Sequence, residues 1–237
     1  MTNRDKGASP NIGTLNEKPL HAALKRVIAE PGDRFEVRVG RFVVDVLRGS
    51  QIIEIQTGAT SVLRRKLTEL LGRHAVRLVI PLAARKDILR IDNAGALVTK
   101  RRSPKRLGIL DAFDALVALR TLLGDPNFSI EVLLIHEEEV RRPRAPRGRR
   151  RKDWEVDERR LVEVLDRISF DHPGDYLAAI PATVSEPFTT ADLADALGRS
   201  RRHAQLIAYC LREIGSIRAV DRTREGYHYV RDFGSEP

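Results

Sequence analysis

The sequence predicts an α/β protein in which a mixed sheet is flanked by helices, with a small α+β domain at the C-terminal end. Two observations support this prediction. Segments in which apolar and polar residues alternate stand between segments with the helical spacing of apolar residues. A run of like charge that also contains Pro and Gly, residues 141–152, separates a long first part of the chain from a shorter second part.

The composition points to a protein that binds a polyanion. The chain has 237 residues, of which 42% are hydrophobic, so it can form one large domain or two small ones. Its formal net charge is +9, and residues 141–152 contain eight Lys or Arg and no acidic residue. Only 5% of the residues are aromatic, so stacking on bases is not expected to dominate binding.

Cysteine usage and hydropathy exclude several classes of protein. The single cysteine, Cys210, rules out an internal disulfide and a zinc site made of cysteines. No apolar run is long enough to span a membrane, and the polar N-terminus lacks the apolar segment of a signal peptide. We therefore expect a soluble, cytoplasmic protein.

The first part of the chain, residues 16–140, predicts a helix, an antiparallel meander, a second helix and further strands. Residues 1–15 are polar with Gly and Pro, and we expect them to be disordered. Apolar stripes, breakers and alternation place helices at 16–30, 60–71 and 110–123, and strands at 35–39, 43–47, 52–56, 75–83, 88–92, 96–100 and 128–136. A basic loop covers residues 100–106.

Two acidic residues stand among apolar residues on neighbouring strands of the meander. Asp45 lies on one strand, and Glu54 lies on the next, after a short turn. A lone carboxylate at such a position is costly unless a partner offsets its charge. Two of them together suit Mg²⁺ or Mn²⁺, which binds one or two carboxylates with water and phosphate oxygens. The alternative for each acid is an ion pair with a strand arginine, for example Arg48 or Arg38 beside Asp45.

Asp45, a short hairpin and then Glu54-Ile-Gln56 form a pattern that resembles the PD-(D/E)XK nuclease superfamily. The expected order of helices and strands around them agrees with the core of that family. The resemblance implies a restriction-endonuclease-like domain over residues 16–140, in which Asp45 and Glu54 bind metal and activated water hydrolyses a phosphodiester. It also makes Glu17, on the first helix, a candidate metal ligand. An interpretation of equal weight is that Glu17 is a carboxylate at the start of the helix that complements the helix dipole.

Gln56 occupies the position at which the family usually has a catalytic lysine. Gln forms hydrogen bonds but carries no charge and transfers no proton at neutral pH. A cation from the next helix, Arg65 or Lys66, could substitute for the lysine. We therefore take Asp45, Glu54, Gln56 and Lys66 as the catalytic candidates. Two functions stay open: a DNA-binding, metal-dependent nuclease, and a non-enzymatic DNA-binding or regulatory protein whose nuclease-like domain has lost activity.

The second part of the chain, residues 153–237, resembles a winged helix-turn-helix domain over about fifty residues. Helices are expected at 153–168, near 176–180, at 188–198 and at 201–214, followed by strands at 216–220 and 227–231. The resemblance makes residues 201–214 a recognition helix. The candidate DNA-contacting residues are Arg199, Ser200, Arg201, Arg202, His203 and Gln205 at its start, Arg222 and Arg224 on the wing, and Arg147, Arg149, Arg150 and Arg151 in the linker.

Other partners are compatible with the same sequence. A winged helix also serves in protein interaction, where its helix start would be a solvated surface. The linker, residues 141–152, neutralises phosphates without sequence choice and would bind RNA as readily as DNA. Many nucleases of the family act as dimers, so a homodimer is compatible with the resemblance. The whole chain also resembles prokaryotic proteins of the same two-domain layout, which imply no function.

Overall fold

The structure, a computed structural model, describes residues 18–144, 154–224 and 226–232. The expectation of disorder for residues 1–15 lies outside these ranges. Four candidate DNA-contacting arginines of the linker and the candidate metal ligand Glu17 also lie outside them.

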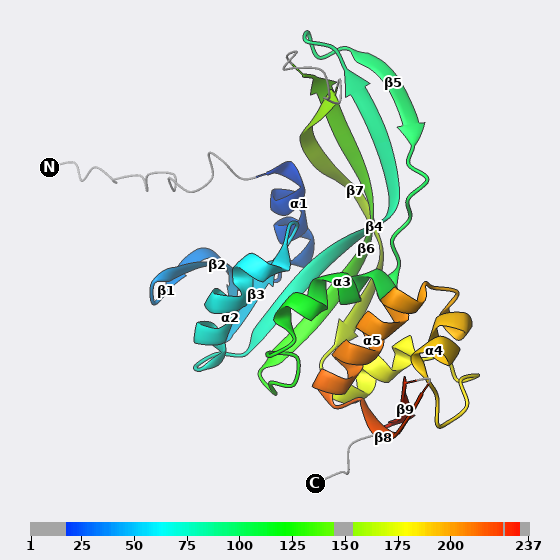
Figure 1. Ribbon diagram of the computed structural model, residues 1–237. Coiled ribbons are helices and arrows are strands. Elements are labelled where there is room, and N and C mark those ends of the chain that lie inside the picture. Colours follow the sequence, from blue (N-terminus) through cyan, green and yellow to red (C-terminus); the bar gives the residue numbers. More distant parts are fainter. Residues whose placement is uncertain (1–17, 145–153, 225, 233–237) are drawn as a thin grey trace, which may run out of the picture.

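A seven-stranded mixed sheet forms the larger part of the molecule (Figure 1). Its strands are β1 (Arg34–Val39), β2 (Phe42–Arg48), β3 (Gln51–Ile55), β4 (Val76–Ile91), β5 (Leu97–Arg102), β6 (Phe128–Pro143) and β7 (Trp154–Phe170). The order across the sheet is β1-β2-β3-β4-β6-β7, and β5 pairs with β4 beyond the end of β3. β1, β2 and β3 are antiparallel neighbours, whereas β4 runs parallel to both β3 and β6. The predicted α/β class with a mixed sheet is confirmed.

Helices cover both faces of this sheet. α1 (Pro19–Ile28) packs on one face against apolar residues of β2, β3, β4 and β6. The opposite face is covered by α2 (Arg64–Leu71), which follows the short turn η2 (Thr60–Leu63), and by a broken helical segment. That segment consists of η3 (Ile109–Ala112), α3 (Phe113–Leu116) and η4 (Val117–Leu119), where a single helix over 110–123 was predicted.

The long strands β4, β6 and β7 extend past the small meander and curve upward as an arm that also carries β5 (Figure 1). The predicted strands at 75–83 and 88–92 are one continuous strand, β4, because its pairing with β6 continues through an irregularity between Ala83 and Arg85. The predicted hairpin with residues 96–100 is formed by the far end of β4 with β5.

The helix predicted over residues 153–168 is wrong, because these residues form β7, which pairs antiparallel with β6 along its whole length. Register shifts opposite Leu134/Ile135, His136/Glu137 and Val140/Arg141 insert extra residues into the ladder. Each insertion shifts the alternation by one residue, so the apolar positions of a strand acquire spacings that imitate a helix. Residues 154–170 thus belong to the large sheet, and the segment expected as an inter-domain linker connects two paired strands.

The C-terminal part contains η5 (Pro173–Ala179), α4 (Thr190–Leu197), α5 (Arg201–Ile214) and a hairpin of β8 (Ile217–Thr223) and β9 (Gly226–Arg231). Thr189 caps α4 by accepting hydrogen bonds from the backbone of Ala191 and Asp192, and Ser200 caps α5. Gly198 and Gly215 end the two helices in the left-handed conformation. These two predicted helices and the hairpin are confirmed. Among the described residues, no helix has the length and apolar character needed to cross a membrane.

Candidate functional site

Asp45 and Glu54 lie beside each other at the point where the ladder between β2 and β3 ends. The last residue pair of this ladder is Val46 with Ile53. Beyond it, the amide of Asp45 donates to Glu54 Oε1 at 3.3 Å, and the amide of Ile55 donates to Asp45 Oδ2 at 2.8 Å. Each carboxylate therefore accepts a hydrogen bond from a backbone amide that, in a regular ladder, would be donated to a carbonyl oxygen of the neighbouring strand. Both are held in the gap between the two strands.

The strand alternation breaks at this point. Val44 and Leu47 contact the core beneath α2, whereas Val46 contacts the core beneath α1. Regular alternation would have put Val44 and Val46 on the same face of the sheet. Glu36, which lies between the pairs Phe35–Val46 and Val37–Val44 on β1, has a φ of 50°, a strained value for a residue with a side chain. The distortion of β1 and β2 is what turns Asp45 into the gap.

Two basic side chains complete a group that we call the carboxylate cluster: His21, Asp45, Glu54 and Lys66. Lys66 reaches over from α2, and its Nζ donates to Glu54 Oε2 at 2.7 Å and to the carbonyl oxygen of Val43 at 2.6 Å. His21 Nε2, on α1, lies 3.2 Å from Asp45 Oδ1. The structure thus brings together three of the four residues named as catalytic candidates.

The two carboxyl groups differ in their affinity for protons. Burial raises the pKa of Glu54 to about 7, and the negative charge of Asp45 adds to the rise, against the opposing effect of Lys66. Burial also pushes the pKa of Asp45 upward, but the hydrogen bond and charge of His21 and the amide of Ile55 outweigh it and hold that pKa below its usual value. Asp45 is therefore ionised at neutral pH. Glu54, with a pKa of about 7, is protonated in part of the molecules at that pH.

Gln56 has a different partner. Its side-chain amide donates to the carbonyl oxygen of Ala59 at 2.7 Å and so closes the loop that follows β3. The contact fixes the loop, and within the part of the chain that the structure describes no hydrogen bond joins the Gln56 side chain to the carboxylate cluster. Lys66 is the cation beside the two acids.

The cluster has the donor set for a hard divalent cation. Mg²⁺ or Mn²⁺ takes one or two carboxylates and completes its shell with water or phosphate oxygens. Asp45 and Glu54 supply these carboxylates, but Lys66 already occupies Oε2 of Glu54. A cation must therefore share Glu54 with Lys66 and must also displace the proton that the raised pKa retains.

His21 is not among the candidate site residues that the sequence predicts. The first helix was expected to contribute Glu17 instead. In the sequence His21 comes four residues after Glu17, the spacing at which two positions of a predicted helix share one side. A search for possible metal ligands one helical turn after Glu17 would have found His21.

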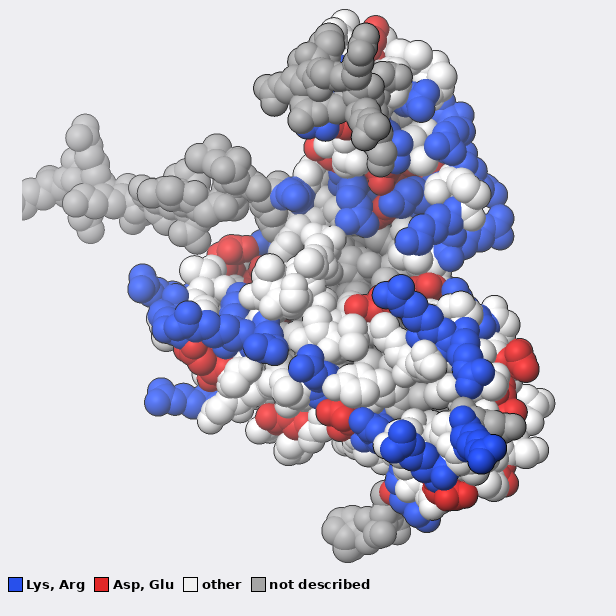
Figure 2. Space-filling view, viewed as in Figure 1, with Lys and Arg blue, Asp and Glu red and all other residues white. Residues whose placement is uncertain are grey.

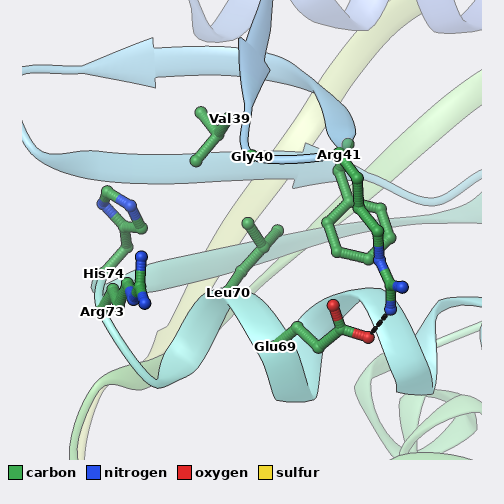
Figure 3. Close-up of a pocket in the computed structure, with 8 residues that line it drawn as sticks. Val39, Gly40, Arg41, Glu69, Leu70, Arg73 and His74 are labelled. Atoms are coloured by element: carbon green, nitrogen blue, oxygen red, sulfur yellow. Dashed lines mark hydrogen bonds and ion pairs between the residues drawn. The ribbon is translucent and has the colours of Figure 1, made fainter.

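A cavity of about 390 Å³ lies further along the same helix as Lys66. It is lined by Val39, Gly40, Arg41, Phe42, Glu69, Leu70, Arg73 and His74. Figure 3 shows Arg41 pairing with Glu69 across the cavity, while Arg73 and His74 stand at the end of α2. None of the predicted site residues that the structure describes lines this cavity.

The residues expected at the start of the recognition helix divide into two groups. Arg201, Arg202 and Gln205 are exposed, as are Arg222 and Arg224 on the hairpin. Arg199 instead donates to Asp111 Oδ2 at 3.1 Å, and His203 lies against Asp114. Ser200 accepts the amide hydrogen of His203 at 3.3 Å. One side of the helix start therefore faces η3 and α3 rather than solvent.

Comparison with known proteins places the chain in a family. A family model described as a domain of unknown function (DUF8091) matches residues 18–171. The chain belongs to this family. The matched residues begin directly before α1 and end directly after β7, so they contain the whole large sheet and the carboxylate cluster.

A relative and the solved structures complete the comparison. An uncharacterized protein of Treponema pallidum (strain Nichols) is 31% identical over 185 residues, which cover 77% of this chain and 73% of that protein. No solved structure matches the chain. The family name states no activity, so function has to be argued from the site.

Proposed function

We propose that the protein is a DNA-binding, metal-dependent phosphodiester hydrolase of the restriction-endonuclease-like class. The observation that carries this proposal is the carboxylate cluster: Asp45 and Glu54 in one gap between strands, with Lys66 at 2.7 Å from Glu54. A cation beside two carboxylates is the arrangement that the PD-(D/E)XK pattern requires, with the lysine supplied from α2 rather than from β3.

The topology around the cluster supports the same proposal. The order is α1, an antiparallel meander of β1, β2 and β3, then α2, and then β4 parallel to β3. The pattern is the one on which the resemblance to the nuclease family rested. Fold alone does not assign an activity, so the argument depends on the side chains.

Each side chain of the cluster has a role in the proposed reaction. A bound Mg²⁺ or Mn²⁺ would activate water and offset charge on the phosphate. Asp45 and Glu54 would hold this cation, and His21 would keep Asp45 ionised and oriented. Lys66 would place a positive charge next to the attacking water and the phosphate oxygens. Gln56 would act indirectly, by fixing the loop after β3.

The proposed partner is DNA, which the C-terminal part would bind as a winged helix. Exposed Arg201 and Arg202 at the start of α5, with Arg222 and Arg224 on the hairpin, suit contacts to phosphates. Lys and Arg also gather over β5 on the arm (Figure 2). Phosphate contacts of this kind do not by themselves distinguish DNA from RNA.

A second candidate function is a DNA-binding protein that does not cleave. Lys66 already neutralises Glu54, and Gln56 is bound to Ala59, so the cluster is satisfied as an internal ion-pair network. In this case Asp45, Glu54 and Lys66 would only stabilise the meander.

Cleavage of supercoiled plasmid with Mg²⁺ or Mn²⁺ separates the two functions. We expect wild type to cleave, and Asp45→Asn, Glu54→Gln and Lys66→Met to lose about a hundredfold or more of the rate. Arg65→Met is the matched control, because Arg65 is adjacent but its side chain is 79% exposed and pairs with Glu69 rather than with Glu54. Equal rates in wild type and Lys66→Met would contradict the proposed site. Binding without cleavage at any metal concentration would establish the second function.

A further inference from the structure

A separate group of metal-ligating side chains lies where the start of α5 meets η3 and α3. We call it the junction cluster: Asp111 of η3, Asp114 of α3 and His203 of α5. One ligand atom from each residue lies within 4.8 Å of the other two. Asp111 and Asp114 are three residues apart and so point to the same side of their helical segment. Residues far apart in the sequence thus place an imidazole opposite two carboxylates.

His203 has an unsatisfied nitrogen at this place. Its Nε2 is buried and has no hydrogen-bond partner among the residues that the structure describes. The nearest carboxylate oxygen, Asp114 Oδ1, is 4.0 Å away, too far for a hydrogen bond. Two ligands of one tetrahedral ion lie about 3.3 Å apart, given metal–ligand bonds of about 2.0–2.1 Å. Asp114, whose side chain is 68% exposed, is free to close the remaining gap.

Asp111 is held in position by other contacts. The amide of Gly108 donates to its Oδ2 at 2.7 Å, and Arg199 donates to the same oxygen at 3.1 Å. Oδ1 has only a weaker contact of 3.4 Å with Arg199. The carboxylate is therefore oriented through Oδ2, which leaves Oδ1 as the ligand atom, and Arg199 offsets one of the two negative charges.

A cavity adjoins the junction cluster. Asp111 and Asp114 line a space of about 390 Å³ that is also lined by Gln56, Thr57 and Lys105. An ion held by three protein ligands at this wall would keep its remaining coordination positions directed toward the cavity. Three protein ligands with an open position are typical of a site that binds a further small ligand or water.

We propose that Asp111, Asp114 and His203 bind a divalent transition-metal ion of the Zn²⁺ or Co²⁺ type, which ties α5 to α3. The imidazole ligand selects against Mg²⁺, which prefers oxygen ligands and octahedral geometry. The ion would fix the orientation of α5, and with it the exposed Arg201 and Arg202, relative to the sheet. This site does not depend on the proposed nuclease activity, because it shares no residue with the carboxylate cluster.

Titration with Co²⁺ tests the proposal, since tetrahedral Co²⁺ absorbs visible light. The full-length protein is treated with chelator, and all variants carry Glu54→Gln, so that binding at the carboxylate cluster does not contribute. We expect one Co²⁺ per chain, displaced by Zn²⁺ and not by Mg²⁺, and about tenfold or more weaker binding after His203→Gln or Asp114→Asn. His74→Gln is the matched control and should bind Co²⁺ normally.

Two outcomes would overturn the proposal. One is the absence of visible absorption on adding Co²⁺ to the Glu54→Gln protein. The other is unchanged Co²⁺ affinity in Asp114→Asn, a variant at an exposed side chain that is not expected to affect folding. A thermal melt gives a second readout: Zn²⁺ should raise the Tm of Glu54→Gln protein but not that of the protein that also carries Asp114→Asn. Neither result bears on plasmid cleavage, so the two proposals fail separately.

Discussion

The carboxylate cluster places two acids side by side and gives them opposite proton affinities. Asp45 has His21 and the amide of Ile55 as partners, so its charge is stabilised. Glu54 is 3% exposed and faces the charge of Asp45, so it keeps a proton up to a pKa of about 7. Two acids whose pKa values are moved apart are typical of sites that bind a cation or transfer a proton.

The raised pKa of Glu54 predicts that it stabilises the folded protein more at low pH than at high pH. The folded-state pKa of Glu54, about 7, exceeds the ordinary glutamate value of 4.5 that applies to the unfolded chain, so this stabilisation is fully present below pH 4.5 and is lost as pH rises through 7. Glu54→Gln cannot titrate. We expect the unfolding free energy of wild type, relative to Glu54→Gln, to fall by about 3 kcal/mol between pH 4.5 and pH 8.

Urea denaturation of both proteins at pH 4.5 and at pH 8 measures this difference. Asp45 has the opposite sign, because its lowered pKa gives stability that is lost only as pH falls through the acid range below about 4, so it does not interfere. The same pH response in wild type and in Glu54→Gln would show that Glu54 is not a titrating group in this range.

Part of the cluster was predictable from the sequence, and part was not. The positions of Asp45 and Glu54 on neighbouring strands, and of Lys66 on the following helix, follow from local periodicity. The gap in the ladder does not, because it depends on the strained backbone at Glu36 and on hydrogen bonds that the carboxylates themselves accept. The contact of His21 with Asp45 also depends on how α1 packs on the sheet.

β7 shows why a secondary-structure element can be misread from sequence. Its pairing with β6 satisfies its backbone groups, so the tertiary neighbour decides between helix and strand. Two arginines of β7 bind acids of β6: Arg159 pairs with Glu137, and Arg167 pairs with Glu131. Neither contact has a signature in the local sequence, whereas the regular elements α4 and α5 carry theirs in Thr189, Gly198 and Ser200.

The ion pair of Arg159 predicts a large effect of one substitution. Glu137 is fully buried, and its carboxylate is offset by Arg159 and by Lys86 at 2.7 Å. Arg159→Met leaves that charge with Lys86 alone, so we expect it to destabilise the protein by about 2–3 kcal/mol in urea denaturation. Arg160→Met is the matched control on the next residue of β7.

The control should have little effect, because Arg160 is 53% exposed and pairs with Glu158 of its own strand. A loss of no more than about 0.5 kcal/mol is expected for it. Adding Glu137→Gln to Arg159→Met should recover part of the lost stability, since it removes the uncompensated charge. Equal destabilisation by the two arginine substitutions would contradict a buried role for Glu137.

The distribution of charge over the whole molecule predicts how binding to DNA responds to salt. Arg101, Lys105 and Arg106 are exposed on β5 and the loop after it. If the arm contacts phosphates, changing all three to Gln should lower the slope of log affinity against log salt by about 2–3. Fluorescence anisotropy with a labelled duplex at several salt concentrations measures this slope.

A control with the same change in net charge separates local contacts from overall attraction. Changing Arg26, Arg34 and Arg38 to Gln removes three exposed charges from α1 and β1. This variant should bind somewhat more weakly at low salt but keep a slope close to that of wild type. Similar slopes for both triple variants would show that the arm has no special role.

The core of the molecule does not separate at the boundary that the sequence suggested. Phe113 and Leu116 beside the sheet belong to the same buried cluster as Ile207 and Leu211 of α5. The charge and Pro content of residues 141–152 predicted a linker between domains. Composition describes only this segment itself and carries no information about the strands on either side of it, which pair with each other. The large sheet and the C-terminal helices therefore share apolar surface.

A shared core predicts that both parts unfold together. Ile207 is fully buried, so Ile207→Ala should remove about 2–4 kcal/mol of stability. The single tryptophan, Trp154, lies at the start of β7 under Arg90, and its fluorescence reports on the sheet rather than on α5. If the core is continuous, a change in α5 must lower the urea midpoint seen by Trp154 fluorescence and by far-ultraviolet circular dichroism equally.

The control is Val220→Ala, at an exposed position of β8, which should shift neither midpoint. A Trp154 transition that Ile207→Ala leaves in place would instead mean two domains that unfold independently, as the sequence had suggested.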